Sequence, residues 1–151
     1  MRTEAAQLHR IVQQRGWKLK DLSIVFVVDD EEEVLASLEA ILTTHGYQVK
    51  CFTSAEQFLT AHDPSQIGCI LIDLLMPGMN GQELVHRLRK SGSLLSVVIG
   101  SGLLDQEDLK AFAASSVPTL EKPYLVPTLL TMVEDGVADS VKRRDRSHRK
   151  Q

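Results

Sequence analysis

The chain contains few cysteines, few aromatic residues and no long apolar run. Cys51 and Cys69 are its only cysteines, and because their spacing fits no metal motif we interpret them as reduced packing thiols. No apolar segment reaches the roughly 20 residues that a membrane-spanning helix needs. The N-terminal stretch MRTEAAQLHRIVQQRG carries charges throughout, unlike a secretory signal. We therefore expect a cytoplasmic protein that contacts no membrane.

Charges of the two signs are unevenly distributed along the chain. The formal net charge is −3, yet residues 142–150, KRRDRSHRK, hold six basic residues and one aspartate. An acidic body with a basic end results. We interpret residues 141–151 as a disordered, solvated basic tail. Contact with nucleic acid or an acidic partner is the alternative, because Lys and Arg neutralise phosphates in any sequence, but no folded nucleic-acid-binding motif supports it.

Short apolar, β-branched runs recur along the chain, separated by segments with helical spacing. The runs are IVFVV (24–28), GYQVKCF (46–52), GCILI (68–72), SVVIG (96–100) and SVPTL (116–120). Alternating strands and helices predict a parallel sheet, and near-continuous apolar strands suit a sheet covered on both faces. The length of 151 residues fits one such domain. The expected fold class is α/β, a doubly wound five-stranded parallel sheet in a three-layer sandwich.

The segments between the runs predict five helices. They are expected over about 32–45, after Ser54 as N-cap, and over 81–90, 104–115 and 125–137. Pro118 lies inside the fifth run, and proline is largely confined to the edges of a sheet. Because the flavodoxin-like order 2-1-3-4-5 leaves the fifth strand at an edge, we expect that strand order.

Polar residues stand where four of the five apolar runs end. Asp29 and Asp30 follow the first run, Asp73 the third, Ser101 the fourth and Lys122 the fifth. Ligands of doubly wound sheets bind beyond the carboxyl ends of the strands, near the point where the strand order reverses. Three carboxylates, a hydroxyl and an ammonium group would therefore meet in one shallow pocket. Such a site suits Mg²⁺, which binds through one or two carboxylates plus phosphate and keeps several waters.

Each of these residues also has a purely structural interpretation. Asp29 and Asp30 can stabilise the N-terminus of the following helix, by about 0.3–1 kcal/mol each. Taken alone, Ser101 is an ordinary turn residue and Lys122 an ordinary surface lysine. Their joint placement at successive strand ends is what favours a binding site.

Four motifs resemble those of response regulator receiver domains, the CheY-like superfamily, and especially its FixJ-like subgroup. They are VVDDEE (27–32), IDLLMPGMNGQEL (72–84), VVIGSG (97–102) and LEKPY (120–124). The resemblance covers about residues 22–140, which we take as the receiver domain. It implies a domain of two-component signalling that is phosphorylated rather than an enzyme acting on small substrates.

The resemblance also implies a role for each site residue. Asp73 would accept a phosphoryl group from the phosphohistidine of a sensor histidine kinase or a histidine phosphotransfer protein. Ser101 and Lys122 would bind the phosphoryl oxygens, and the Lys122–Pro123 bond would be cis, as is typical of the family. The Mg²⁺ ligands would be Asp30, Asp73 and the main-chain carbonyl of Leu75, with Asp29 acting mainly through water.

Three positions depart from the family pattern. Thr119 stands where receivers usually carry Tyr or Phe, three residues before the lysine, so we expect a subdued or differently routed conformational response. Leu75 and Leu103 flank the pocket where many relatives have polar side chains. Because leucine cannot position an attacking water, we expect a comparatively long-lived acyl phosphate.

Residues 1–21 are expected to form an N-terminal extension. An amphipathic helix is predicted over residues 3–15, with an apolar face made of Ala5, Leu8, Ile11 and Val12. Packing of this helix against its own receiver domain is the favoured interpretation. Formation of a homodimer or docking to the kinase is the alternative.

Three functions remain open at this point. The favoured one is a stand-alone receiver that signals through contacts with an unknown downstream protein. The second is the receiver part of a DNA-binding transcriptional regulator without its output domain, because FixJ-like receivers are commonly followed by a helix-turn-helix domain. The third is a phosphatase-like hydrolase with Asp73 as nucleophile. No recognition helix or substrate pocket is visible in the sequence, which favours the first.

Overall fold

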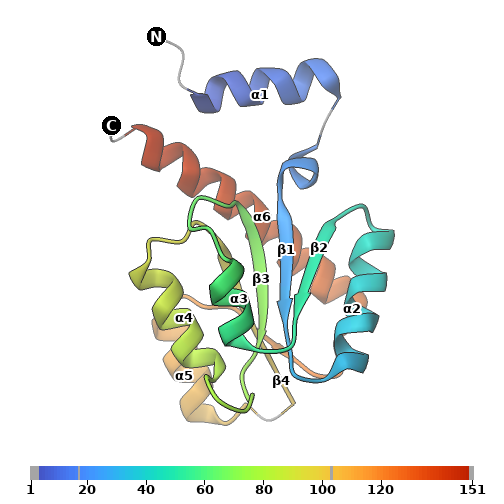
Figure 1. Ribbon diagram of the computed structural model, residues 1–151, viewed down its shortest axis with the longest axis vertical. Helices are drawn as coiled ribbons and strands as arrows, with labels where there is room; N and C mark the ends of the chain where they lie inside the picture. Colours follow the sequence, from blue (N-terminus) through green and yellow to red (C-terminus); the bar gives the residue numbers. More distant parts are fainter. Residues whose placement is uncertain (1–3, 17, 103, 150–151) are drawn as a thin grey trace.

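The computed structural model describes residues 4–16, 18–102 and 104–149, and its central feature is a parallel sheet with helices on both faces (Figure 1). The strands are β1 (Ile24–Val28), β2 (Gln48–Phe52), β3 (Gly68–Asp73), β4 (Ser96–Ser101) and β5 (Thr119–Glu121). The helices are α1 (Glu4–Arg15), the 3-10 helix η1 (Leu19–Leu22), α2 (Glu32–Thr44), α3 (Ala55–Ala61), α4 (Gly81–Lys90), α5 (Gln106–Ala114) and α6 (Val126–Arg149).

The strand order is β2-β1-β3-β4-β5 with all neighbours parallel, which confirms the predicted topology. The central strands β1 and β3 are paired so that Val28 lies opposite Ile72, and β3 pairs with β4 so that Asp73 lies opposite Gly100. The carboxyl ends of β1, β3 and β4 therefore meet at one edge of the sheet. The strand order reverses between β1 and β3, where a ligand site is expected in such folds.

Two separate hydrophobic cores lie on the two faces of the sheet, because successive residues of each strand point to opposite faces. On one face Ile70 and Ile72 pack against α3, α4 and α5, and on the other Cys69 and Leu71 pack against α2 and α6. Both faces are thus covered, as the near-continuous apolar runs predict. Cys69 is a buried free thiol and Cys51 a partly buried one, in agreement with their interpretation as packing residues.

Of the helices predicted between the strands, four had both bounds given, and each begins within two residues of its observed start. Three of these four also end within two residues of the observed end, whereas α6 continues well beyond residue 137. For α3, the predicted N-cap Ser54 accepts a hydrogen bond from the backbone N–H of Gln57 at 3.1 Å. The fifth strand differs from its prediction, since Pro118 precedes β5 instead of lying inside it. Its carbonyl accepts a hydrogen bond from the N–H of Ile99 at 2.9 Å. Because proline has no N–H to return, regular pairing begins only at Thr119.

The prediction of a disordered basic tail over residues 141–151 is wrong for residues 141–149, which continue α6. The buried hydroxyl of Ser140 donates to the carbonyl of Leu94 at 2.6 Å and accepts from the N–H of Gly68 at 2.9 Å. One turn further, the guanidinium of Arg143 donates to the carbonyl of Leu95 at 3.0 Å. These contacts hold the helix against the sheet where the sequence shows, apart from Val141, only polar and charged residues. Residues 150–151 lie outside the described part of the chain.

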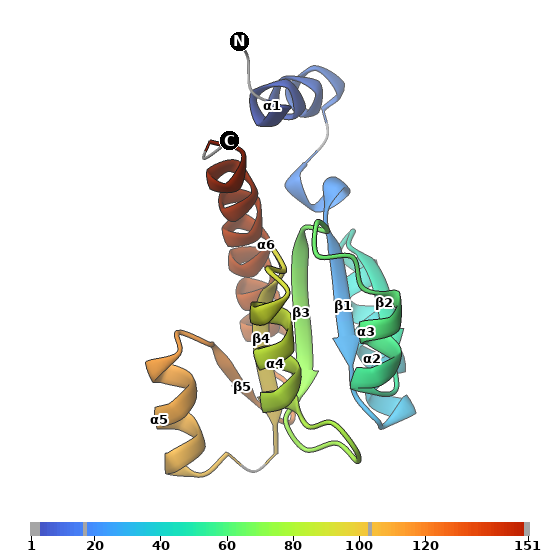
Figure 2. The ribbon, with the colours of Figure 1, turned by 60° about the vertical axis from the view of Figure 1, so that its left-hand side comes forward.

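The N-terminal helix α1 lies beside the far end of α6, away from the carboxyl edge of the sheet (Figures 1 and 2). Its observed range, Glu4–Arg15, confirms the helix predicted over residues 3–15. The predicted apolar face of Ala5, Leu8, Ile11 and Val12 falls outside the described side chains. Among residues 4–16, 18–102 and 104–149, none of the helices combines the length and apolar character that crossing a bilayer requires.

Candidate functional site

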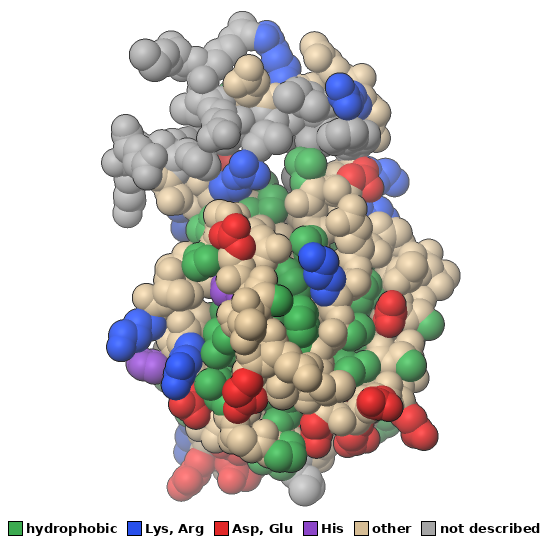
Figure 3. Space-filling model, viewed as in Figure 1, with side chains coloured by type: hydrophobic (Ala, Val, Ile, Leu, Met, Phe, Trp, Pro, Cys, Tyr) green, Lys and Arg blue, Asp and Glu red, His purple; other side chains and the backbone are tan. Residues whose placement is uncertain are grey.

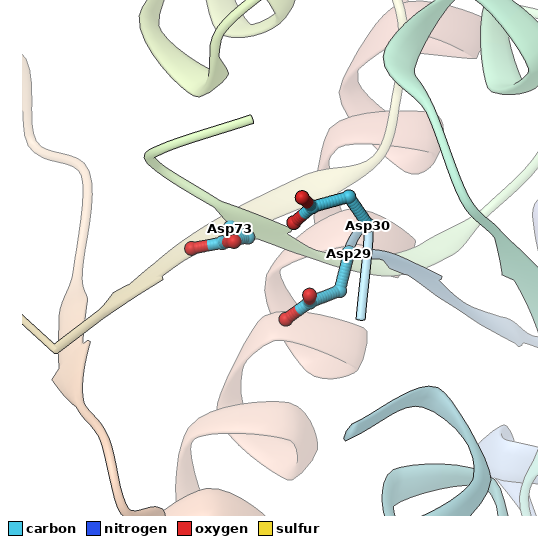
Figure 4. A group of neighbouring side chains, drawn as sticks. All are labelled: Asp29, Asp30 and Asp73. Atoms are coloured by element: carbon cyan, nitrogen blue, oxygen red, sulfur yellow. The ribbon is translucent and has the colours of Figure 1, made fainter. Parts of the chain in front are cut away.

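Three carboxylates meet at the carboxyl edge of the sheet, as the sequence predicts (Figure 4). Asp29 and Asp30 directly follow β1, and Asp73 is the last residue of β3. One oxygen atom from each carboxylate lies within 4.8 Å of the others. Asp29 and Asp73 are buried, whereas Asp30 is exposed. Opposite ligands of a bound Mg²⁺ are about 4 Å apart, so this cluster could hold a divalent metal ion after small side-chain movements.

Lys122 reaches into this cluster from the segment that follows β5. Its Nζ donates a hydrogen bond to Oδ2 of Asp29 at 2.7 Å and lies 3.6 Å from Oδ1 of Asp73. Burial lowers the pKa of Lys122, but the hydrogen bond and charge of Asp29 and the charge of Asp73 outweigh that effect and leave the pKa raised. The ammonium group therefore remains charged at neutral pH. The bond from Lys122 to Pro123 is cis, as the family resemblance implies.

Asp29 has both roles that the sequence allows, since it hydrogen-bonds the backbone at the start of α2 and also belongs to the acidic cluster. Its Oδ1 accepts a hydrogen bond from the backbone N–H of Glu31 at 2.9 Å, at the start of α2, while Oδ2 faces Lys122. A carboxylate fixed at both oxygens, and only 2% exposed, cannot turn away from the site. Helix stabilisation and site formation are thus two uses of the same side chain.

Asp73 is in a setting that disfavours its charged form. Burial and the neighbouring charge of Asp29 raise its pKa from the ordinary 3.8 to about 6, against the opposing effects of Lys122 and of the Leu75 N–H. At pH 7 the carboxylate is still the main form, and it carries a charge that the surroundings only partly balance. A bound cation would remove this penalty.

Ser101 and Leu75 complete the set of predicted site residues. Ser101 ends β4 with only 1% of its surface exposed, and its carbonyl accepts a hydrogen bond from the N–H of Lys122 at 3.0 Å. Leu75 follows two residues after Asp73, and its apolar side chain is 61% exposed. Leu103, predicted on the other side, lies outside the described residues.

Sequence reasoning missed one side chain of this region, the aromatic ring of Tyr124. Its hydroxyl lies against Gly100, where a Cβ atom would overlap it. Burial, followed by the charges of Asp29 and Asp73, raises the pKa of Tyr124. A glycine inside an apolar strand often marks the close approach of another group. Gly100 in the run VVIGS was therefore the one sequence feature that indicated a neighbouring side chain here.

Comparisons with known proteins agree with this geometry. A sequence model described as the response regulator receiver domain matches residues 25–134, a segment that contains all the predicted site residues. The chain is 32% identical over 114 residues to the transcriptional regulatory protein FixJ of Bradyrhizobium diazoefficiens, covering 75% of this chain and 56% of that protein. It thus spans little more than half the length of this curated relative.

Solved structures show the same fold. The response regulator StyR has a TM-score of 0.75 at 30% identity, covering 85% of this chain and 65% of that one. A CheY-like receiver domain protein from Methanospirillum hungatei has a TM-score of 0.72 at 23% identity, covering 80% of this chain and 98% of that one. With the matched segment, the strand order and the acidic cluster in agreement, the chain belongs to the response regulator receiver domain family of two-component signalling systems.

Proposed function

We propose that this protein accepts a phosphoryl group on Asp73 from the phosphohistidine of a sensor histidine kinase or histidine phosphotransfer protein. It would then signal, in the cytoplasm, through contacts with a downstream protein. The observation that carries the proposal is the placement of the Lys122 ammonium between two buried carboxylates, 2.7 Å from Asp29 and 3.6 Å from Asp73. A cation fixed at that point can stabilise the charge of a phosphoryl group as it arrives.

Transfer requires one new bond and one broken bond. A carboxylate oxygen of Asp73 attacks the phosphorus, the P–N bond of the phosphohistidine breaks, and the electron pair returns to the imidazole nitrogen. The negative charge that spreads over the phosphoryl oxygens is stabilised by the ammonium of Lys122. Because Asp73 has a pKa of about 6 without a metal ion, it is largely ionised and ready to attack at pH 7.

The acidic cluster would hold Mg²⁺ in this reaction. Its ligands would be Asp30, Asp73 and the carbonyl of Leu75, with Asp29 acting mainly through water. The metal ion would neutralise charge on the phosphoryl oxygens. Two positive charges from the ion and one from Lys122 would balance the three carboxylates, so the site would carry no net negative charge when the phosphoryl group arrives.

Mass spectrometry of the intact protein tests this proposal. After incubation with acetyl phosphate and Mg²⁺, we expect one added phosphate on the wild type and none on Asp73→Asn or in the presence of EDTA. Asp63→Asn, a change at an exposed carboxylate on the loop after α3, serves as the matched control and should be labelled normally. A labelled Asp73→Asn, or a wild type that stays unlabelled, would contradict the proposal. Continuous hydrolysis of acetyl phosphate over many rapid cycles would favour the hydrolase alternative.

A second candidate function is the receiver part of a DNA-binding transcriptional regulator. The relative FixJ is named a transcriptional regulatory protein, and the matched region is 56% of its length. For this chain, binding to duplex DNA that weakens steeply with rising salt would support the candidate. Unchanged mobility of DNA at low salt, with or without phosphorylation, would count against it.

A further inference from the structure

The hydroxyl of Tyr124 occupies a position beside the proposed phosphoryl acceptor. Gly100 in β4 is paired in register with Asp73 in β3. Two residues earlier, Val98 and Leu71 both belong to the core between the sheet and helices α2 and α6, so by strand alternation Gly100 and Asp73 face that same side. Tyr124 lies with its hydroxyl where the missing Cβ of Gly100 would be. Since neighbouring strands are about 4.8 Å apart, the hydroxyl stands roughly that far from Cβ of Asp73.

The ring of Tyr124 is held in this place by its surroundings. It packs partly buried against the α2–α6 core. Its centroid lies 6.0 Å from Nζ of Lys122, the ammonium that contacts both Asp29 and Asp73. The ring therefore lies between the α2–α6 core and the ammonium group of Lys122. Because burial and the two acids keep the phenol protonated, its hydroxyl can donate a hydrogen bond to an anion.

Ser101 cannot substitute for this hydroxyl, because alternation along β4 directs it to the other face of the sheet from Gly100. A phosphoryl group on Asp73 presents three oxygens, and Lys122 contacts it from one side only. The side toward α6 is where Tyr124 lies.

We propose that the Tyr124 hydroxyl is a hydroxyl donor of the phosphoryl site, positioned by the absence of a side chain at Gly100. This inference rests on the proposed function of Asp73 as phosphoryl acceptor. It assigns to the residue two positions after the lysine a binding role of its own, and it makes glycine at position 100 a requirement of the site. A side chain at that position would push the hydroxyl away from Asp73.

Labelling kinetics with acetyl phosphate and Mg²⁺ test the inference. Tyr124→Phe keeps the ring and removes only the hydroxyl, and we expect it to accept the phosphoryl group about tenfold more slowly or worse, as for the loss of one hydrogen bond to a charged group. Tyr47→Phe is the matched control, since Tyr47 is the only other tyrosine, is also partly buried and has a lysine, Lys20, 5.6 Å from its ring centroid. It should be labelled at the wild-type rate.

A spectroscopic measurement separates hydrogen bonding from packing. In protein labelled with ¹³C at the tyrosine ζ carbon, Tyr47→Phe assigns the two signals. Beryllofluoride with Mg²⁺, as a mimic of the phosphoryl group, should shift the Tyr124 signal beyond any effect of Mg²⁺ alone and leave the Tyr47 signal in place. An unmoved Tyr124 signal would overturn the inference.

The glycine requirement is tested by Gly100→Ala. We expect this variant to label as slowly as Tyr124→Phe, and the double variant to be no slower than either, because both changes remove the same contact. Wild-type rates in Tyr124→Phe, with the wild type itself labelled, would overturn this inference and leave the proposed function intact. A wild type that takes no label would overturn both.

Discussion

Asp73 is a buried carboxylate whose charge the protein tolerates at a cost to stability. In the metal-free state its pKa is raised from 3.8 to about 6, first by burial and then by the charge of Asp29. The folded state therefore holds this proton more tightly than the unfolded state does. The free energy of unfolding must fall as the pH rises from about 4 through about 6.

Asp73→Asn should consequently stabilise the protein in EDTA at pH 7.5, by about 1–3 kcal/mol. The gain should shrink as the pH is lowered toward 4, where the carboxyl is protonated in the folded state and close to half protonated in the unfolded state. Urea unfolding followed by circular dichroism measures both values. As a control of opposite sign, Asp63 has a lowered pKa because it accepts hydrogen bonds from the Ser65 N–H and hydroxyl, so Asp63→Asn should not stabilise at pH 7.5. Equal stabilities of Asp73→Asn and wild type at pH 7.5 would refute the argument.

Under the proposed function, Leu75 bears on how long a phosphoryl group would stay attached to Asp73. Its apolar side chain, 61% exposed, cannot hydrogen-bond a water molecule in line for attack on the phosphorus. Leu75→Asn supplies such a group and should shorten the lifetime of the phosphorylated protein by about tenfold. The lifetime is measured as the decay of the phosphorylated mass after removal of acetyl phosphate. Leu109→Asn, at an exposed leucine of α5, is the matched control, and a lifetime unaffected by Leu75→Asn would exclude this role.

At the scale of the elements, the attachment of α6 depends on one buried hydroxyl. The Ser140 hydroxyl accepts a hydrogen bond from the N–H of Gly68 and donates one to the carbonyl of Leu94, and so connects this helix to both segments. Ser140→Ala leaves both backbone groups without this partner in a buried place and should lower the free energy of unfolding by about 2–3 kcal/mol. Ser147→Ala, at an exposed serine of the same helix, should have little effect. Unfolding of the two variants in urea makes the comparison, and similar midpoints would show that α6 is held by its apolar contacts alone.

The elements also show which features the sequence can predict. The range of α4 follows from local signals, because Leu84, Val85 and Leu88 recur at helical spacing after Asn80, whose side chain caps the helix. The acidic cluster follows from topology, since parallel strands bring their carboxyl ends to one edge. The full length of α6 could not be predicted, because Ser140 is indistinguishable in sequence from an exposed polar residue. Its partners lie 72 and 46 residues away along the chain.

The position of Tyr124 was equally inaccessible to local reasoning. Its relation to the site depends on the register of β3 and β4, which places Gly100 beside Asp73. A glycine in a strand gives the signal that something approaches, but it does not say which residue. The roles of the individual residues at the site remain predictions that the labelling experiments test.

At the scale of the whole molecule, one visible face shows acidic side chains gathered toward one end of the strands. On the face drawn in Figure 3, Asp and Glu side chains gather toward the lower end, which is where the carboxyl ends of β1 and β3 lie in Figure 1. The basic turns of α6 lie toward the opposite end. A concentration of negative charge around the acidic cluster attracts divalent cations and opposes the approach of an anionic phosphoryl donor. Under the proposed function, the site would therefore need its cation before transfer could be fast.

The response of the whole molecule to phosphorylation should be concentrated near β5 and the start of α6. Strand β5 has three residues, pairs only with β4 and begins at Thr119, which stands where the family resemblance leads one to expect an aromatic ring. Without that ring, a change at Ser101 has no large side chain to move against α5, which lies at the edge of the molecule (Figure 2). In ¹⁵N-labelled protein, beryllofluoride with Mg²⁺ should shift the amide signals of residues 119–126 strongly and those of α5 little. Thr119→Tyr should increase the shifts of the α5 amide signals. If the α5 amide signals of the wild type shift as much as those around Lys122, the conformational response travels by a route that needs no aromatic residue at position 119.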